Sequence, residues 1–204
     1  MCTLFACEDP STWRRAYEKY WHVVEAKAKA KGKKPGGKLL DLDKWPRLQQ
    51  LVASNSEDTV EKCSRKAFSL LPDVQAAIAE LSSLKGVGPA TASAVIAAGA
   101  PEQTAFMSDE AMESVPGLKP IQYTAKHYAL YLGKMVERTE KLNKVDPHQD
   151  WTPHRLEMCL WAMTIAKQQQ LPLLKDVDAK ASSVTEKCSD ADADQRPAKK
   201  LKTR

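Results

Sequence analysis

The chain has 204 residues, of which 43% are hydrophobic, and a formal net charge of +5 at pH 7. This length suffices for one sizeable helical core, and no run of about 18 apolar residues is present to form a transmembrane helix. The N-terminus lacks the basic start and long apolar stretch of a signal peptide, so we expect an intracellular protein with no membrane partner.

Cysteine and histidine spacing argues against a metal centre. The five cysteines are scattered and include no Cys-x-x-Cys pair, which predicts reduced thiols and no iron–sulfur cluster. The four histidines also lack metal-ligand spacing. We therefore expect no metal and no cofactor.

Residues 1–26 are expected to form an amphipathic helix, capped by Asp9 or Ser11 with Pro10 in its first turn. Aromatic and apolar residues recur along it at spacings of three and four, at Trp13, Ala16, Tyr17, Tyr20, Trp21 and Val24. This spacing favours an aromatic core stripe with a solvated basic face; the alternative is a base-stacking surface. Residues 27–38, rich in lysine and glycine, then predict a flexible basic linker.

Residues 39–174 are expected to form a helical domain, because no strand-like alternation of useful length is present. Pro46 predicts a break between two short helical pieces, and Asn55 or Ser56 can cap the next helix. The expected buried stripe of that helix is Val60, Cys63, Ser64, Ala67, Phe68 and Leu71.

A helical hairpin is predicted over residues 72–98. Helical spacing before the turn involves Val74, Ala77, Ile78, Leu81 and Leu84, with Pro72 in a first turn. A second apolar helix, opened by Pro89, carries Ala92, Val95 and Ile96. Only Gly86-Val87-Gly88 lies between them, and glycine allows the positive φ that such a reversal requires.

This turn has the chemistry of a phosphate site. The first amides of the helix from Pro89 have no partners within the helix, and the helix dipole favours an anion there. Lys85 adds a nearby cation. Such contacts reach the phosphate backbone rather than base edges, so they predict binding without sequence preference.

These residues resemble the helix-hairpin-helix motif of DNA-binding proteins, whose hairpin reads hydrophobic-x-Gly-hydrophobic-Gly before a small-residue helix. The resemblance implies DNA contacts from Lys85, Gly86, Val87, Gly88, Ala90 and Thr91. The alternative is a helical hairpin that only packs, with its glycines serving as cap and turn.

The resemblance extends to helix-hairpin-helix DNA glycosylases, which place a catalytic aspartate about 20 residues past the hairpin; Asp109 lies at the matching distance. Bifunctional members use a lysine just after the hairpin, and Ala90 at that position has no amine, which excludes this lyase chemistry. The resemblance thus implies a monofunctional glycosylase or an inactive relative. Asp109 at a helix start is equally explained as a cap or dipole acid, and Glu110 is a weaker candidate.

The chain is also similar to a eukaryotic family within this superfamily that shares residues 51–55 and the hairpin. Its members carry additional helical sequence between the equivalents of Trp45 and Pro46. This similarity implies a shortened form with less sequence available to build a base pocket.

Past a loop at residues 116–120, a long helix is expected to bury Tyr123, Tyr128, Tyr131, Leu132, Met135 and Leu142. Thr152-Pro153 opens a last helix with Leu156, Cys159, Leu160 and Met163 on its apolar side. Residues 175–204 predict a disordered tail with a basic end. Lys199, Lys200 and Lys202 resemble a nuclear import signal, which implies an import receptor as partner and a nuclear location; a merely soluble tail and a cytoplasmic location are the alternatives.

The sequence therefore predicts an all-α, glycosylase-like helical domain with two candidate functions. One is sequence-nonspecific DNA backbone binding, with or without base removal in DNA repair. The other is a nuclear protein–protein interaction scaffold without DNA-binding or enzymatic activity.

Overall fold

The computed structural model describes residues 4–32, 46–175 and 177, and every regular element among them is a helix, which confirms the all-α prediction. The α-helices are α1 (Pro10–Glu18), α2 (Tyr20–Gly32), α3 (Pro46–Ala53), α4 (Glu57–Ser69), α5 (Val74–Leu81), α6 (Pro89–Gly99), α7 (Asp109–Ser114), α8 (Ala125–Val145) and α9 (Pro153–Gln168). Short 3-10 helices span Leu4–Ala6 and Pro172–Leu174. Residues 33–38 of the predicted linker, residues 176 and 178–204 of the predicted tail, and with them the basic residues Lys199, Lys200 and Lys202, lie outside the described residues.

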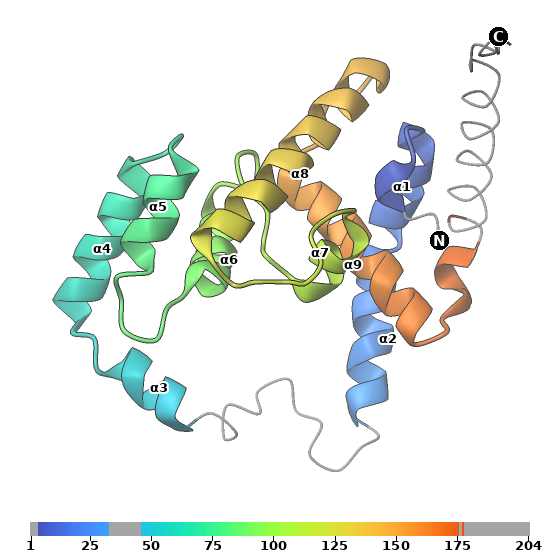
Figure 1. The fold of residues 1–204 in the computed structure, drawn as a ribbon. Helices are drawn as coiled ribbons and strands as arrows, with labels where there is room; N and C mark the ends of the chain where they lie inside the picture. Colours follow the sequence, from blue (N-terminus) through green and yellow to red (C-terminus); the bar gives the residue numbers. More distant parts are fainter. Residues whose placement is uncertain (1–3, 33–45, 176, 178–204) are drawn as a thin grey trace, which may run out of the picture.

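Helix α9 is central to the packing. It packs against α1, α2, α7 and α8, while α5 packs against α4, α6 and α8 (Figure 1). Helices α4 and α5 thus form one side of the molecule, α1 and α2 the other, and α6 to α9 lie between them. The hairpin α5–α6 packs against α4 through α5 and against α8 through both of its helices.

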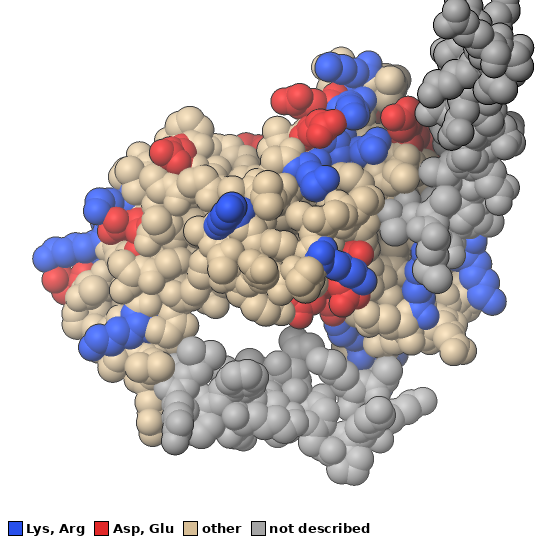
Figure 2. Space-filling view, viewed as in Figure 1, with Lys and Arg blue, Asp and Glu red and all other residues tan. Residues whose placement is uncertain are grey.

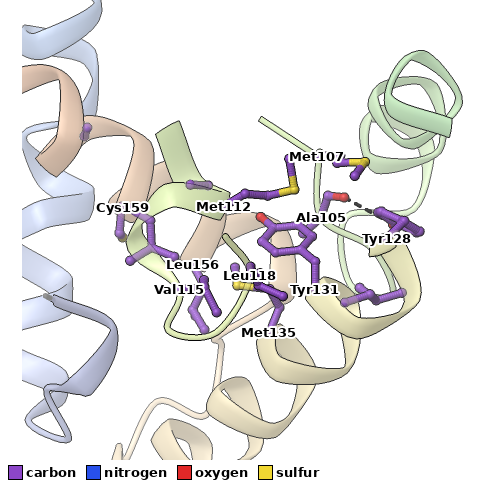
Figure 3. Close-up of a cluster of buried hydrophobic side chains, with 14 of the residues drawn as sticks. Ala105, Met107, Met112, Val115, Leu118, Tyr128, Tyr131, Met135, Leu156 and Cys159 are labelled. Carbon is purple, nitrogen blue, oxygen red and sulfur yellow. Dashed lines mark hydrogen bonds between the residues drawn. The ribbon is translucent and has the colours of Figure 1, made fainter. Parts of the chain in front are cut away.

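Two tyrosines of α8 anchor the segment that leads from α6 to α7. Tyr128 and Tyr131 are fully buried, and their hydroxyls donate to the carbonyl oxygens of Ala105 and Phe106, at 3.2 and 3.1 Å. Met107, Met112 and other apolar side chains pack around them (Figure 3). Burial raises the pKa of both phenols, so they remain neutral hydrogen-bond donors.

The N-terminal helix differs from its prediction. The chain forms two helices, α1 and α2, that meet at Lys19, and the interruption changes which residues face the core. Trp13 and Ala16 are buried as expected, but Trp21 is 66% exposed and Val23 is buried instead. Helical structure also continues to Gly32, into the segment predicted as linker.

Four residues differ from their predicted burial or from their predicted place in a helix. Val60 and Val95 are exposed, because each helix packs through one face only and these side chains lie on the other. Tyr123 precedes α8 and is 55% exposed. Pro72 lies before α5, which begins at Val74 with Asp73 as its N-cap. The remaining predicted apolar positions of α5, α8 and α9 are buried.

Candidate nucleic-acid interface

The turn between α5 and α6 has the backbone geometry that its glycines predict. Gly86 has a φ of 77°, in the left-handed region, while Gly88 is extended, with φ −104° and ψ 179°, and forms the N-cap of α6. The Val87 amide donates to the Leu84 carbonyl at 3.1 Å, which closes the turn. The two glycines therefore have different roles, since only Gly86 requires a conformation that L side chains rarely adopt.

The exposed part of this turn includes the start of α6. Lys85, Gly88 and Thr91 are exposed, whereas Val87 and Ala90 are half-buried and pack against the core. A Cβ built on Gly88 would meet no atom within 4 Å. Of the six residues predicted to contact DNA, these three thus have the most open access.

The first turn of α6 has backbone amides without a partner within the helix. Its N-cap is a glycine, so no side chain caps the helix, and Pro89 follows as the first helical residue. Pro89 has no N–H and the Ala92 amide donates to the Gly88 carbonyl at 2.9 Å, so the amides without an acceptor within the helix are those of Ala90 and Thr91. The dipole of an 11-residue helix adds partial positive charge there. This end of α6 has the properties of an anion-binding terminus.

Asn55 holds the hairpin from outside. Its Nδ2 donates to the carbonyl oxygen of Lys85 and its Oδ1 accepts from the Lys85 amide, both at 3.0 Å. The same Nδ2 also donates to the Val52 carbonyl at the end of α3. The sequence predicts Asn55 or Ser56 as a helix cap, and Ser56 is the N-cap of α4. No local signal marks the contact with Lys85, since the two residues are 30 positions apart.

One buried hydroxyl connects α6 with the segment that precedes Asp109. Ser93 Oγ donates to the Ala90 carbonyl at 2.7 Å and accepts the Met107 amide at 3.0 Å. Ser93 is fully buried, and its bond with the Met107 amide is shielded from water. The start of α6 and the start of α7 are therefore positioned relative to each other by this serine.

Asp109 is the first residue of α7 and is exposed. The Tyr123 hydroxyl donates to its Oδ1 at 2.7 Å, and this bond raises the pKa of Tyr123. Asp109 does not line the cavity of about 300 Å³ that is formed by residues 117–130. The carboxylate can stabilise a nearby positive charge, but it can equally serve as the first-turn acid of its helix.

The neighbours of Asp109 have structural partners. Ser108 is the N-cap of α7, but its hydroxyl donates to the buried Glu157 at 2.7 Å instead of capping the helix. Glu110 pairs with Lys27 at 3.2 Å, and the Lys27 ammonium lies over the Trp161 ring. These pairings leave Asp109 as the more accessible of the two adjacent carboxylates.

The charge of the surface is dispersed. Figure 2 shows basic and acidic side chains interspersed at the edges of one face, with few charged side chains across its middle. Within the described part of the chain, no group of three or more His, Cys, Asp or Glu residues could hold a metal ion. Over the same residues, no helix is long and apolar enough to cross a membrane. The described cysteines, Cys7, Cys63 and Cys159, are buried free thiols.

Comparison with known proteins identifies no relative of this chain. No protein-family model matches the chain, and no curated protein or solved structure matches it either. The geometry of the hairpin and its surroundings is therefore the basis for inferring function.

Proposed function

We propose that the hairpin at residues 84–91 binds the sugar–phosphate backbone of DNA without sequence preference. The observation that carries this proposal is the exposed N-terminus of α6, where Gly88 places no side chain between the first-turn amides and an approaching phosphate. Lys85, an exposed residue three positions before Gly88, supplies a cation on the same turn. None of these groups reads a base edge, so binding is expected to depend on salt and not on sequence.

A matched pair of glycine variants tests the proposal. Gly88→Leu adds bulk at the start of α6, and Gly133→Leu adds the same bulk on α8; neither position has an atom within 4 Å of the added Cβ. We expect Gly88→Leu to weaken binding to a fluorescein-labelled DNA duplex roughly tenfold in fluorescence anisotropy, since blocking two or three phosphate contacts of about 0.5–1 kcal/mol each gives this loss. Gly133→Leu should bind as the unmodified protein does.

The basic end of the chain needs its own control, because lysines bind DNA wherever they occur. A variant with Lys199, Lys200 and Lys202 changed to glutamine separates the two contributions. The effect of Gly88→Leu should persist in this background. If folded Gly88→Leu protein binds DNA with unchanged affinity and salt dependence, the hairpin does not bind DNA.

Base removal is a second candidate function, supported by Asp109. This carboxylate is exposed, follows the hairpin by about 20 residues in sequence, and belongs to a segment that Ser93 joins to α6. In the proposed reaction Asp109 stabilises the positive charge that develops on the sugar as the base departs, or orients the attacking water. Ala90 provides no amine for a Schiff base, so the activity would be that of a monofunctional glycosylase.

Asp109→Asn separates chemistry from binding. It should abolish base release from a panel of duplexes with damaged bases and leave DNA affinity within about twofold, because the substitution conserves shape and the hairpin is untouched. If the unmodified protein releases no base from any of the substrates, DNA binding without catalysis is the remaining function. If the protein also fails to bind DNA, the interaction scaffold is favoured.

The proposed nuclear location has its own test. Imaging of the tagged protein, with and without the change of Lys199, Lys200 and Lys202 to glutamine, shows whether these lysines direct it to the nucleus.

A further inference from the structure

A groove of about 630 Å³ lies between the start of α5, the middle of α8 and the start of α9. One face of α8, which includes Leu132, Val136 and Asn143, lines the groove along its length. Val74 and Trp151 add apolar surface. Asn143 and Trp151 exchange two hydrogen bonds of 3.0 Å, which hold this wall in place. From Leu132 to Asn143 the helix rises about 16 Å, enough for roughly five residues of an extended peptide.

The rim of the groove is acidic. Asp73, Glu102 and Glu140 lie along it, and none of them forms an ion pair with another described residue. No lysine, arginine or histidine is among its described lining residues, although the chain as a whole carries a net charge of +5. Gln103 also lines the groove, and its buried Oε1 has no hydrogen-bond partner among the described residues.

We propose that this groove binds a basic peptide segment of a partner protein, in which lysine or arginine residues flank an apolar side chain. The apolar residue would contact Val136 and Val74 along the groove, and the flanking cations would pair with the three carboxylates.

Charge and position separate this surface from the hairpin. Three carboxylates repel the phosphates of a nucleic acid, so the groove favours a protein ligand. The groove includes the N-terminal end of α5, whereas the hairpin follows the C-terminal end of the same helix, about 12 Å away. The proposal therefore does not depend on DNA binding by the hairpin, and either one can fail without the other.

Fluorescence anisotropy with a labelled Lys-Leu-Lys-Lys-Leu-Lys peptide and the full chain tests the groove. Val136→Arg places a like charge among the expected peptide cations, and the half-exposed position tolerates the larger side chain. We expect at least a roughly tenfold loss of peptide affinity, since juxtaposed like charges are strongly unfavourable in an interface. Leu130→Arg is the matched control, because it adds the same charge to the same helix at a 55% exposed position outside the groove.

A second pair of variants tests the rim. The double variant Glu102→Gln with Glu140→Gln should lower the affinity for the peptide and reduce the salt dependence of binding. Glu137→Gln, which changes a carboxylate of α8 outside the groove, should do neither. Equal effects of Val136→Arg and Leu130→Arg, or equal binding of an acidic Glu-Leu-Glu-Glu-Leu-Glu peptide, would overturn the proposal. The peptide could also bind more tightly after Lys199, Lys200 and Lys202 are changed to glutamine. This result would assign the groove to the chain's own basic end and overturn the proposal of a partner protein.

Discussion

The carboxamide of Asn55 exchanges two hydrogen bonds of 3.0 Å with the backbone of Lys85, across 30 positions of sequence. The same carboxamide contacts the last turn of α3 through the Val52 carbonyl. One side chain, just before the start of α4, therefore joins the end of α3 to the turn of the hairpin.

Asn55→Ala should loosen the hairpin. The substitution leaves the Lys85 amide and carbonyl without their partner, which lowers the free energy of unfolding by about 1–2 kcal/mol. Urea denaturation measures this loss, and hydrogen exchange at the Lys85 amide should accelerate. Ser54→Ala is the control, because the Ser54 hydroxyl donates to Leu51 within its own turn and not to the hairpin. Unchanged exchange at Lys85 in Asn55→Ala would show that the contact does not hold the turn.

The two hairpin glycines should respond differently to alanine. Gly86→Ala forces a side chain into the left-handed region at φ 77° and should lower the free energy of unfolding by about 1–2 kcal/mol. The alanine side chain in Gly88→Ala meets no neighbour and the backbone is extended, so only the poorer N-cap preference of alanine applies, and the free energy of unfolding should fall by about 0.5 kcal/mol. Chemical denaturation of both variants checks the difference. Equal losses would mean that Gly88 also has a conformational role.

A second pair of glycines should shift stability in opposite directions. A Cβ on Gly99, the last residue of α6, would lie 2.5 Å from Phe68 Cε1, so Gly99→Ala must displace the ring and should cost about 1–3 kcal/mol. Gly133 lies within α8 with open space around it, and Gly133→Ala should gain about 0.5–1 kcal/mol from helix propensity. Thermal unfolding of the two variants should give midpoints on opposite sides of the unmodified value; a stable Gly99→Ala would mean that Phe68 moves freely.

Acid should weaken the junction of α1 and α9. Asp150 accepts from Arg14 at 2.7 Å and also pairs with Arg155, and these bonds lower its pKa from the usual 3.8 to about 2. A carboxylate with a depressed pKa stabilises the fold above its unfolded pKa, and this stabilisation is lost as the pH falls from about 4 to about 2. Urea denaturation across this range should show the loss.

Asp150→Asn provides the comparison for the acid effect. The variant should be less stable than the unmodified protein at pH 7, and the difference should shrink below pH 4, where the carboxylate is increasingly protonated in the unfolded chain. Because Asp150 is partly exposed, high salt should also reduce the difference at pH 7. A constant difference between the two proteins from pH 7 to pH 2 would contradict the assignment to Asp150.

Helix type and position followed from the sequence where apolar spacing is regular. Successive turns of α5 and α9 carry apolar residues that are buried as expected, and Pro89 begins α6 as predicted. Predictions were wrong where neighbouring helices decided exposure, as for Val60 and Val95, or where a break changed the helical phase, as at Lys19. The apolar spacing of one helix does not show which residues at the border of its apolar face a neighbouring helix will cover.

The sequence by itself determined the all-α class, the glycine turn and the proline that begins α6, because helix propensity, positive φ and capping act over a few adjacent residues. Only the tertiary structure decided that Asn55 holds Lys85, that Ser93 joins α6 to the approach to Asp109, and that carboxylates from three segments border one groove. These relationships join residues far apart in the chain, and their partners are selected by packing, which local patterns do not encode.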